Sequence, residues 1–151
     1  MNAYMNQYQQ NQVLTASKEQ ILIMLYDGAI RFCRQALAAN KDGNVAEKLG
    51  RISKVYAIIT EFSNSLDHEI GGQISADLDG LYQFMIRELN QARKDTTGQH
   101  LENVEKLLVD LRITWGEAVE INKKELTALV QQHQENGPGA APRTQTLTAS
   151  G

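Results

Sequence analysis

Proline and cysteine are almost absent from this sequence. The 151 residues include two prolines, Pro138 and Pro142, and one cysteine, Cys33. Because proline breaks helices, its absence from the first 135 residues favours an all-α fold. A lone thiol excludes an intrachain disulfide and is typical of a reducing compartment. Cys33 lies within a helical pattern, so we interpret it as a small side chain of the core.

Clustered positive charge and long apolar runs are also missing. The chain has 15 Lys and Arg against 18 Asp and Glu, a net charge of −3, and no basic run. Nucleic-acid binding needs clustered cations, so this composition argues against it. The longest apolar run ends near Tyr26, far short of the ~20 residues that a membrane span requires. The first dozen residues contain no Lys or Arg and do not resemble a secretory signal. We therefore expect a cytoplasmic protein without membrane insertion.

Apolar residues at helical spacing fill four segments of the chain. We expect helices over 18–39, from 45 to the glycine pair at 71–72, over 74–92, and from 101 to about 134. Short turns between them favour an antiparallel up-down-up-down four-helix bundle over 17–135. An unbroken fourth helix would be longer than the other three.

Two flanking segments lack this periodicity. Residues 1–16 are expected to form an N-terminal arm or lid, and 136–151, rich in Gly, Pro, Ala and Thr, a disordered tail. The arm carries candidate apolar anchors at Tyr4, Tyr8 and Val13.

The start of the first helix has apolar side chains on its outer face that another segment must bury. Ser17 and Gln20 have the spacing of a capping box, and Ile21 to Leu25 then place apolar side chains all round one turn. A helix buried on one side needs only an apolar stripe. The outer face of this turn therefore needs cover from the arm or from a partner.

Catalytic signals are weak. A dimetal site in a helical bundle needs inward Glu-x-x-His pairs. His68, His100 and His133 have no Glu or Asp three residues before them, and the single thiol has no evident base partner. A metal or small-molecule enzyme is therefore the third interpretation, and we expect no cofactor.

Apolar residues exceed what narrow helical stripes require. The third helix has one apolar stripe, formed by Ile74, Leu78, Leu81, Met85, Leu89 and Ala92. Further apolar residues lie beside the stripes, at Ile21, Ile23, Ile58, Tyr82, Phe84 and Ile86. Wide-face packing explains any one of them, but together they predict apolar grooves that bind a partner.

Five motifs in order connect the sequence to a known family. They are Tyr-Gln-Gln-Asn-Gln-Val at 8–13, Met-Leu-Tyr-Asp-Gly-Ala-Ile at 24–30, Leu-Asp-His-Glu-Ile-Gly-Gly at 66–72, Leu-Asp-Gly-Leu-Tyr-Gln-Phe-Met-Ile-Arg at 78–87 and Leu-Arg-Ile-Thr-Trp-Gly-Glu-Ala at 111–118. Their order and spacing resemble the flagellar secretion chaperone FliS family. The chain departs from the family at Lys18, where members often have proline.

The resemblance implies a non-enzymatic bundle that holds the disordered C-terminal region of flagellin in the cytoplasm. Such a chaperone prevents premature polymerisation and assists delivery to the flagellar type III export apparatus. The resemblance also implies that the arm acts as a lid, a role that falls here to Tyr8 and Val13, and less directly to Tyr4. The export gate and flagellar regulators are further candidate partners.

The predicted client-binding groove lies on the second and third helices. Its residues are Ile58, Phe62, Leu66, Ile74, Leu78, Tyr82 and Met85. Several of them must also belong to the core, because one helix face cannot serve both purposes fully. The alternative is a generic helical adaptor or dimerisation bundle with another protein partner. We expect a monomer or weak homodimer.

Overall fold

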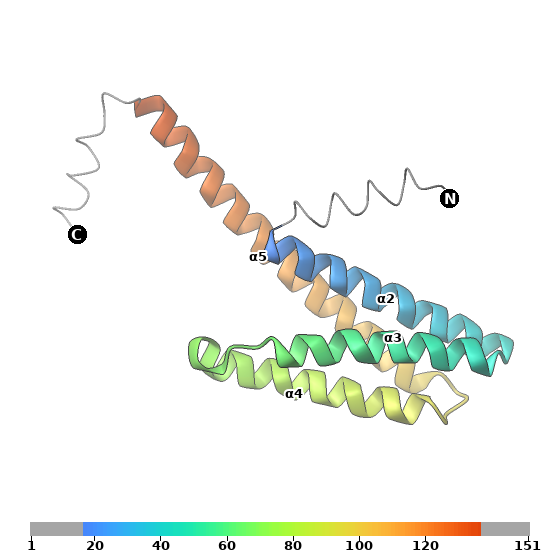
Figure 1. Ribbon diagram of the computed structural model, residues 1–151. Coiled ribbons are helices and arrows are strands. Elements are labelled where there is room, and N and C mark those ends of the chain that lie inside the picture. The colour runs from blue at the N-terminus through green and yellow to red at the C-terminus, as the bar shows by residue number, and fades with distance from the viewer. Residues whose placement is uncertain (1–16, 137–151) are drawn as a thin grey trace. The chain divides into compact units, whose positions relative to one another are not determined.

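The chain folds into helices, as the sequence predicts. The computed structural model describes residues 17–136. The helices in this range are α2 (Lys18–Asp42), α3 (Val45–Asn64), α4 (His68–Ala92) and α5 (Gln99–Asn136) (Figure 1). They confirm an all-α fold. Described residues up to Thr114 belong to one compact unit, and those from Trp115 onward belong to a second. The predicted arm with Tyr4, Tyr8 and Val13, and nearly all of the predicted tail, lie outside the described residues.

The ends of α2 follow local sequence signals. Ser17 Oγ accepts a hydrogen bond from the backbone N–H of Gln20 at 3.2 Å, and Gln20 Oε1 accepts one from the N–H of Ser17 at 3.1 Å. This is the predicted capping box. Gly43 closes the helix with φ 72°, a left-handed conformation that glycine adopts without steric cost. The helix therefore extends to Asp42, beyond the expected end at Ala39.

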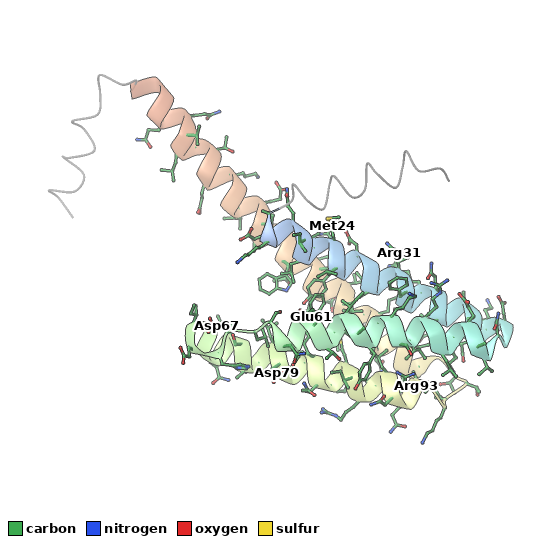
Figure 2. The ribbon with its side chains drawn as sticks, in the orientation of Figure 1. Met24, Arg31, Glu61, Asp67, Asp79 and Arg93 are labelled. Carbon is green, nitrogen blue, oxygen red and sulfur yellow. The ribbon has the colours of Figure 1, made fainter. Side chains whose placement is uncertain are left out.

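The prediction of one helix from residue 45 to the glycine pair is wrong. Helix α3 ends at Asn64, and Leu66 lies in the turn that follows. Asp67 then begins α4, because its carboxylate accepts hydrogen bonds from two backbone N–H groups of the next turn at 3.1 and 3.0 Å (Figure 2). Gly72 interrupts α4 at φ 51° and ψ −123° instead of ending α3. The aspartate cap thus determines the boundary, and the glycine produces a kink.

Polar contacts between side chains show how the helices of residues 17–114 are ordered. On α2 and α5, Asp27 pairs with Arg112 at 2.8 Å and Arg34 pairs with Glu105 at 2.6 Å. Low numbers on one helix match high numbers on the other, so α2 and α5 are antiparallel. Helices α3 and α4 show the same pattern, through the pairs Ser63–Asp79 and Ser53–Arg93. The short turns between α2 and α3 and between α4 and α5 make these two pairs antiparallel too, as the sequence predicts.

An aromatic cluster lies in the core of this unit. The hydroxyls of Tyr26 on α2 and Tyr82 on α4 are hydrogen-bonded at 2.8 Å, and both residues are buried. Phe62 of α3 contacts both, with ring centroids 4.4 Å from Tyr26 and 5.6 Å from Tyr82. Burial, and then the bond to Tyr26, raise the pKa of Tyr82 well above its usual range. The phenol of Tyr82 therefore stays neutral, and the three rings join α2, α3 and α4.

Cys33 occupies the core, as predicted. Its side chain is fully buried, and Sγ donates a hydrogen bond to the carbonyl of Leu101 at 3.4 Å. Burial, and then the charge of Glu105, raise the pKa of the thiol to about 12. A neutral, enclosed thiol is a poor nucleophile, so Cys33 serves packing.

Removing the phenol of Tyr82 tests the core hydrogen bond. We expect Tyr82→Phe to lower the free energy of unfolding by about 1–2 kcal/mol, because the mutation deletes one partner of a buried polar pair. Tyr56→Phe is the matched control, since Tyr56 is half-buried on α3 and contacts Arg93 through its ring face. Urea unfolding measures both. Equal losses in the two variants would contradict a special contribution of the buried pair.

Two glycines of α4 should respond in opposite ways to alanine. Gly72→Ala should lower the free energy of unfolding by roughly 1–3 kcal/mol, because the backbone at φ 51° strains an L side chain. Gly80 is exposed on the helical part of α4, with no atom within 4 Å of an added Cβ. Gly80→Ala should therefore raise the free energy of unfolding by about 0.5–1 kcal/mol. Urea unfolding of both variants is the test, and a stabilised Gly72→Ala protein would show that the kink is not required.

Candidate binding surface

Three residues of the predicted groove lie in the core. Phe62, Tyr82 and Met85 are exposed by only 3%, 2% and 0% of their surface. The sequence places Tyr82 beside the main apolar stripe of its helix, and in the structure it packs against the rings of Phe62 and Tyr26. In this structure their side chains offer almost no surface to a partner, as the sequence analysis expected for part of the set. Their role in client binding remains a prediction.

The other four predicted residues are accessible but do not form one surface. Ile58, Leu66 and Leu78 are half-buried, and Ile74 is 70% exposed. Ile58 lies on the side of α3 that meets α2, with Cδ1 3.9 Å from the position of a Cβ on Gly28. Ile74 and Leu78 share a helix face on α4, whereas Leu66 is in the turn before it. Ile74 and Leu78 thus share one accessible face, and their role in client binding stays a prediction.

Helix α4 exposes an apolar stripe that extends beyond this pair. Leu81 is 36% exposed and Phe84 is 38% exposed, and both follow Ile74 at helical spacing. Ile74 and Leu81 belong to the apolar stripe that the sequence predicts for this helix, and both are exposed although Met85, Leu89 and Ala92 of the same stripe are buried. Phe84, in contrast, was correctly expected outside that stripe. In the sequence, the helical spacing of residues 74, 81 and 84 is the pattern that predicts this surface.

Helix α5 borders the stripe on one side. Glu88 of α4 bonds to His100 Nδ1 at 2.9 Å and accepts a hydrogen bond from Asn103 Nδ2 at 2.7 Å. Because the two helices are antiparallel, Phe84, one turn before Glu88, lies level with Leu107, one turn after Asn103. Leu111 is one turn further along α5, and both leucines are half-buried. We define the α4–α5 surface as Ile74, Leu78, Leu81, Phe84, Leu107 and Leu111.

The chemistry of this surface suits protein binding. Contiguous apolar side chains on the outside of a domain are typical of a partner-binding site. Among the side chains described between residues 17 and 132, no group of three or more His, Cys, Asp and Glu is placed to hold a metal ion. None of the helices described is long and apolar enough to cross a membrane.

Comparison with known proteins identifies the family. The family model described as "Flagellar protein FliS" matches residues 1–122, a range that contains every residue of the α4–α5 surface. The chain belongs to the FliS family.

Curated relatives of the FliS family cover most of this chain. The flagellar secretion chaperone FliS of Bacillus subtilis is 34% identical over 119 residues, which is 78% of this chain and 87% of the relative. The protein of the same name in Salmonella typhimurium is 35% identical over 116 residues, covering 76% and 86%. That of Campylobacter jejuni is 31% identical over 116 residues, covering 77% and 91%. The likeness is thus similar across distant bacteria.

The Glu88 contacts should make stability depend on pH. Hydrogen bonds from Asn103 and His100 hold the pKa of Glu88 below its usual value. A lowered folded-state pKa stabilises the protein above the unfolded value of 4.5, and this contribution is lost as pH falls through the folded-state pKa. Glu88→Gln should therefore be less stable at pH 7 and should lose less stability than wild type between about pH 5 and pH 3.

Urea unfolding at pH 7, 5, 4 and 3 measures this difference. Glu61→Gln is the control, because Glu61 is exposed on α3 (Figure 2). We expect its stability to follow that of wild type across the range. If Glu88→Gln also follows wild type, the Glu88 contacts do not contribute to the acid dependence.

Proposed function

We propose that this protein is a cytoplasmic export chaperone that binds the disordered C-terminal segment of flagellin. It would keep the bound segment from polymerising prematurely and assist its delivery to the flagellar type III export apparatus. Membership of the FliS family, whose relatives are named flagellar secretion chaperones, supports the class of function. The exposed apolar α4–α5 surface is the observation that supports a binding role.

The client would bind as an amphipathic helix laid along the α4–α5 surface. Ordering a disordered segment costs about 2–5 kcal/mol, so a single apolar anchor is not enough. Burying one large apolar side chain contributes roughly 1.5–3 kcal/mol. Several anchors at helical spacing, as Ile74, Leu81 and Phe84 offer, would offset the ordering cost.

The N-terminal arm belongs to the same proposal. Tyr4, Tyr8 and Val13 would cover apolar surface while no client is bound and would leave it when the client arrives. Met24, near the start of α2, is 38% exposed. It is one of the apolar side chains that the arm would cover. The export gate and flagellar regulators remain proposed partners for the loaded chaperone.

Calorimetric titration with a synthetic C-terminal flagellin peptide from the same organism tests the proposal. We expect saturable binding with a negative heat-capacity change, because apolar surface is buried. Phe84→Glu should weaken binding by about tenfold or more, since a carboxylate would be buried without a partner. Ala57→Glu, an equivalent charge at an exposed position of α3, should bind like wild type.

Each contrary outcome has a distinct meaning. No binding by folded wild-type protein would reject flagellin as the client. Strong binding that Phe84→Glu leaves unchanged would keep the client but reject the α4–α5 surface. A stable homodimer that Phe84→Glu dissociates, without peptide binding, would favour the dimerisation bundle.

A further inference from the structure

A second candidate surface lies on the other side of α5, against α2. A groove of about 500 Å³ runs between these helices, within the unit that ends at Thr114. Its apolar lining includes Ile30 and Ala38 from α2 and Val109 and Ile113 from α5. Ile113 is 54% exposed, so an apolar side chain from outside can reach it. This groove shares no residue with the α4–α5 surface.

The rim of the groove carries excess positive charge. Arg31, Arg34 and Arg112 all line it. Arg34 pairs with Glu105 and Arg112 pairs with Asp27, so two of the three guanidinium groups have a carboxylate partner. Arg31 forms no ion pair with any side chain that the structure describes, and its guanidinium carbon lies 5.3 Å from the ring centroid of Phe32 (Figure 2). The rim thus has one cation more than it has carboxylates to neutralise it.

A buried acceptor in the groove lacks a donor. Gln35 lines the groove, and its Oε1 atom is buried without a hydrogen-bond partner. An unpaired buried polar atom costs about 1–3 kcal/mol, whereas an apolar side chain of similar shape would avoid that cost. If the Gln35 side chain turns into the groove, an N–H group of a ligand there supplies the missing donor. This observation is independent of the charge on the rim.

The length of the groove fits a helix. Its lining on α2 extends from Asp27 to Ala38, which at ~1.5 Å per residue is roughly 16 Å. Anchors at positions i, i+4 and i+7 of a partner helix span about 10 Å, so three of them fit within this length. An extended apolar floor with a charged rim suits such a helix better than it suits a compact small molecule.

We propose that the α2–α5 groove binds an acidic amphipathic helix of a partner protein. Apolar anchors of that helix lie between Ala38 and Ile113, and a carboxylate beside them pairs with Arg31. The Gln35 side chain turns into the groove, and a side-chain amide of the same helix donates to its Oε1. Because the groove and the α4–α5 surface lie on different sides of α5, this partner binds without competing with a client on the other surface.

Fluorescence anisotropy with two designed peptides tests the proposal on the full chain. The first is a labelled amphipathic helix with leucines at i, i+4 and i+7, flanking glutamates and one glutamine. The second has lysine at each glutamate position. We expect saturable binding of the glutamate peptide and binding of the lysine peptide at least tenfold weaker. Equal binding of the two, or none, overturns the proposal.

A charge reversal locates the contact. Arg31→Glu should weaken binding of the glutamate peptide at least tenfold and strengthen binding of the lysine peptide. Arg87→Glu, the same change at an exposed position of α4, should alter neither. Phe84→Glu should also leave glutamate-peptide binding unchanged. If Phe84→Glu abolishes binding and Arg31→Glu does not, the peptide uses the α4–α5 surface and the groove is rejected.

Two further variants test the floor of the groove. Ala38→Trp should fill it and reduce binding at least tenfold, while Ala46→Trp, at an exposed position of α3, should not. Gln35→Met should raise the urea midpoint, because it removes the unpaired acceptor, and should weaken glutamate-peptide binding severalfold. A Gln35→Met protein that loses stability, or binds as tightly as wild type, would contradict the role given to Gln35.

Discussion

The buried hydrogen bond between Tyr26 and Tyr82 constrains the rest of the bundle. A phenol can enter an apolar core at low cost only if its hydroxyl finds a partner there. These two hydroxyls meet across α2 and α4, which are not consecutive helices, with Phe62 of α3 stacked beside them. The bond therefore fixes the rotation of α4 about its own axis. Once Tyr82 points inward, Phe84, two residues further along the helix, must point away from the core, and Leu81, one residue before Tyr82, lies at its edge.

The position of α5 depends on a second set of polar contacts, around the turn before it. Asn40 of α2 donates a hydrogen bond to the carbonyl of Thr96 at 2.9 Å, and buried Lys48 of α3 donates one to the carbonyl of Asp95 at 2.6 Å. Gly98 adopts φ 82° close to Leu37. Two other helices thus hold the start of α5, which positions its third and fourth turns to form both an apolar surface with α4 and a charged groove with α2.

These two surfaces differ in what they can recognise. The α4–α5 surface is mainly aliphatic and aromatic, so its binding strength would come from buried area and would tolerate variation in the partner. The α2–α5 groove combines an apolar floor with an unpaired cation and an unpaired carbonyl oxygen. Polar groups of this kind penalise a partner that cannot match them, and therefore confer specificity. A chaperone that must hold one protein and meet others would need both kinds of surface.

Local signals in the sequence determined the helices, the capping box at Ser17, the stop at Gly43 and the unusual length of α5. Each depends on residues close together in the chain, and so does the apolar surplus that predicted a binding surface. Only the tertiary structure decided which apolar residues of α4 face outward. A broad helical stripe has residues at both edges, and local spacing cannot say which edge is buried. A hydroxyl pair 56 residues apart in the chain holds Tyr82 inward and so turns Phe84 outward. The boundary before α4 could not be read from the sequence, because Asp67 and the glycine pair are both local signals for a helix boundary. In the folded chain the Asp67 cap forms and starts α4, and Gly72 only kinks that helix.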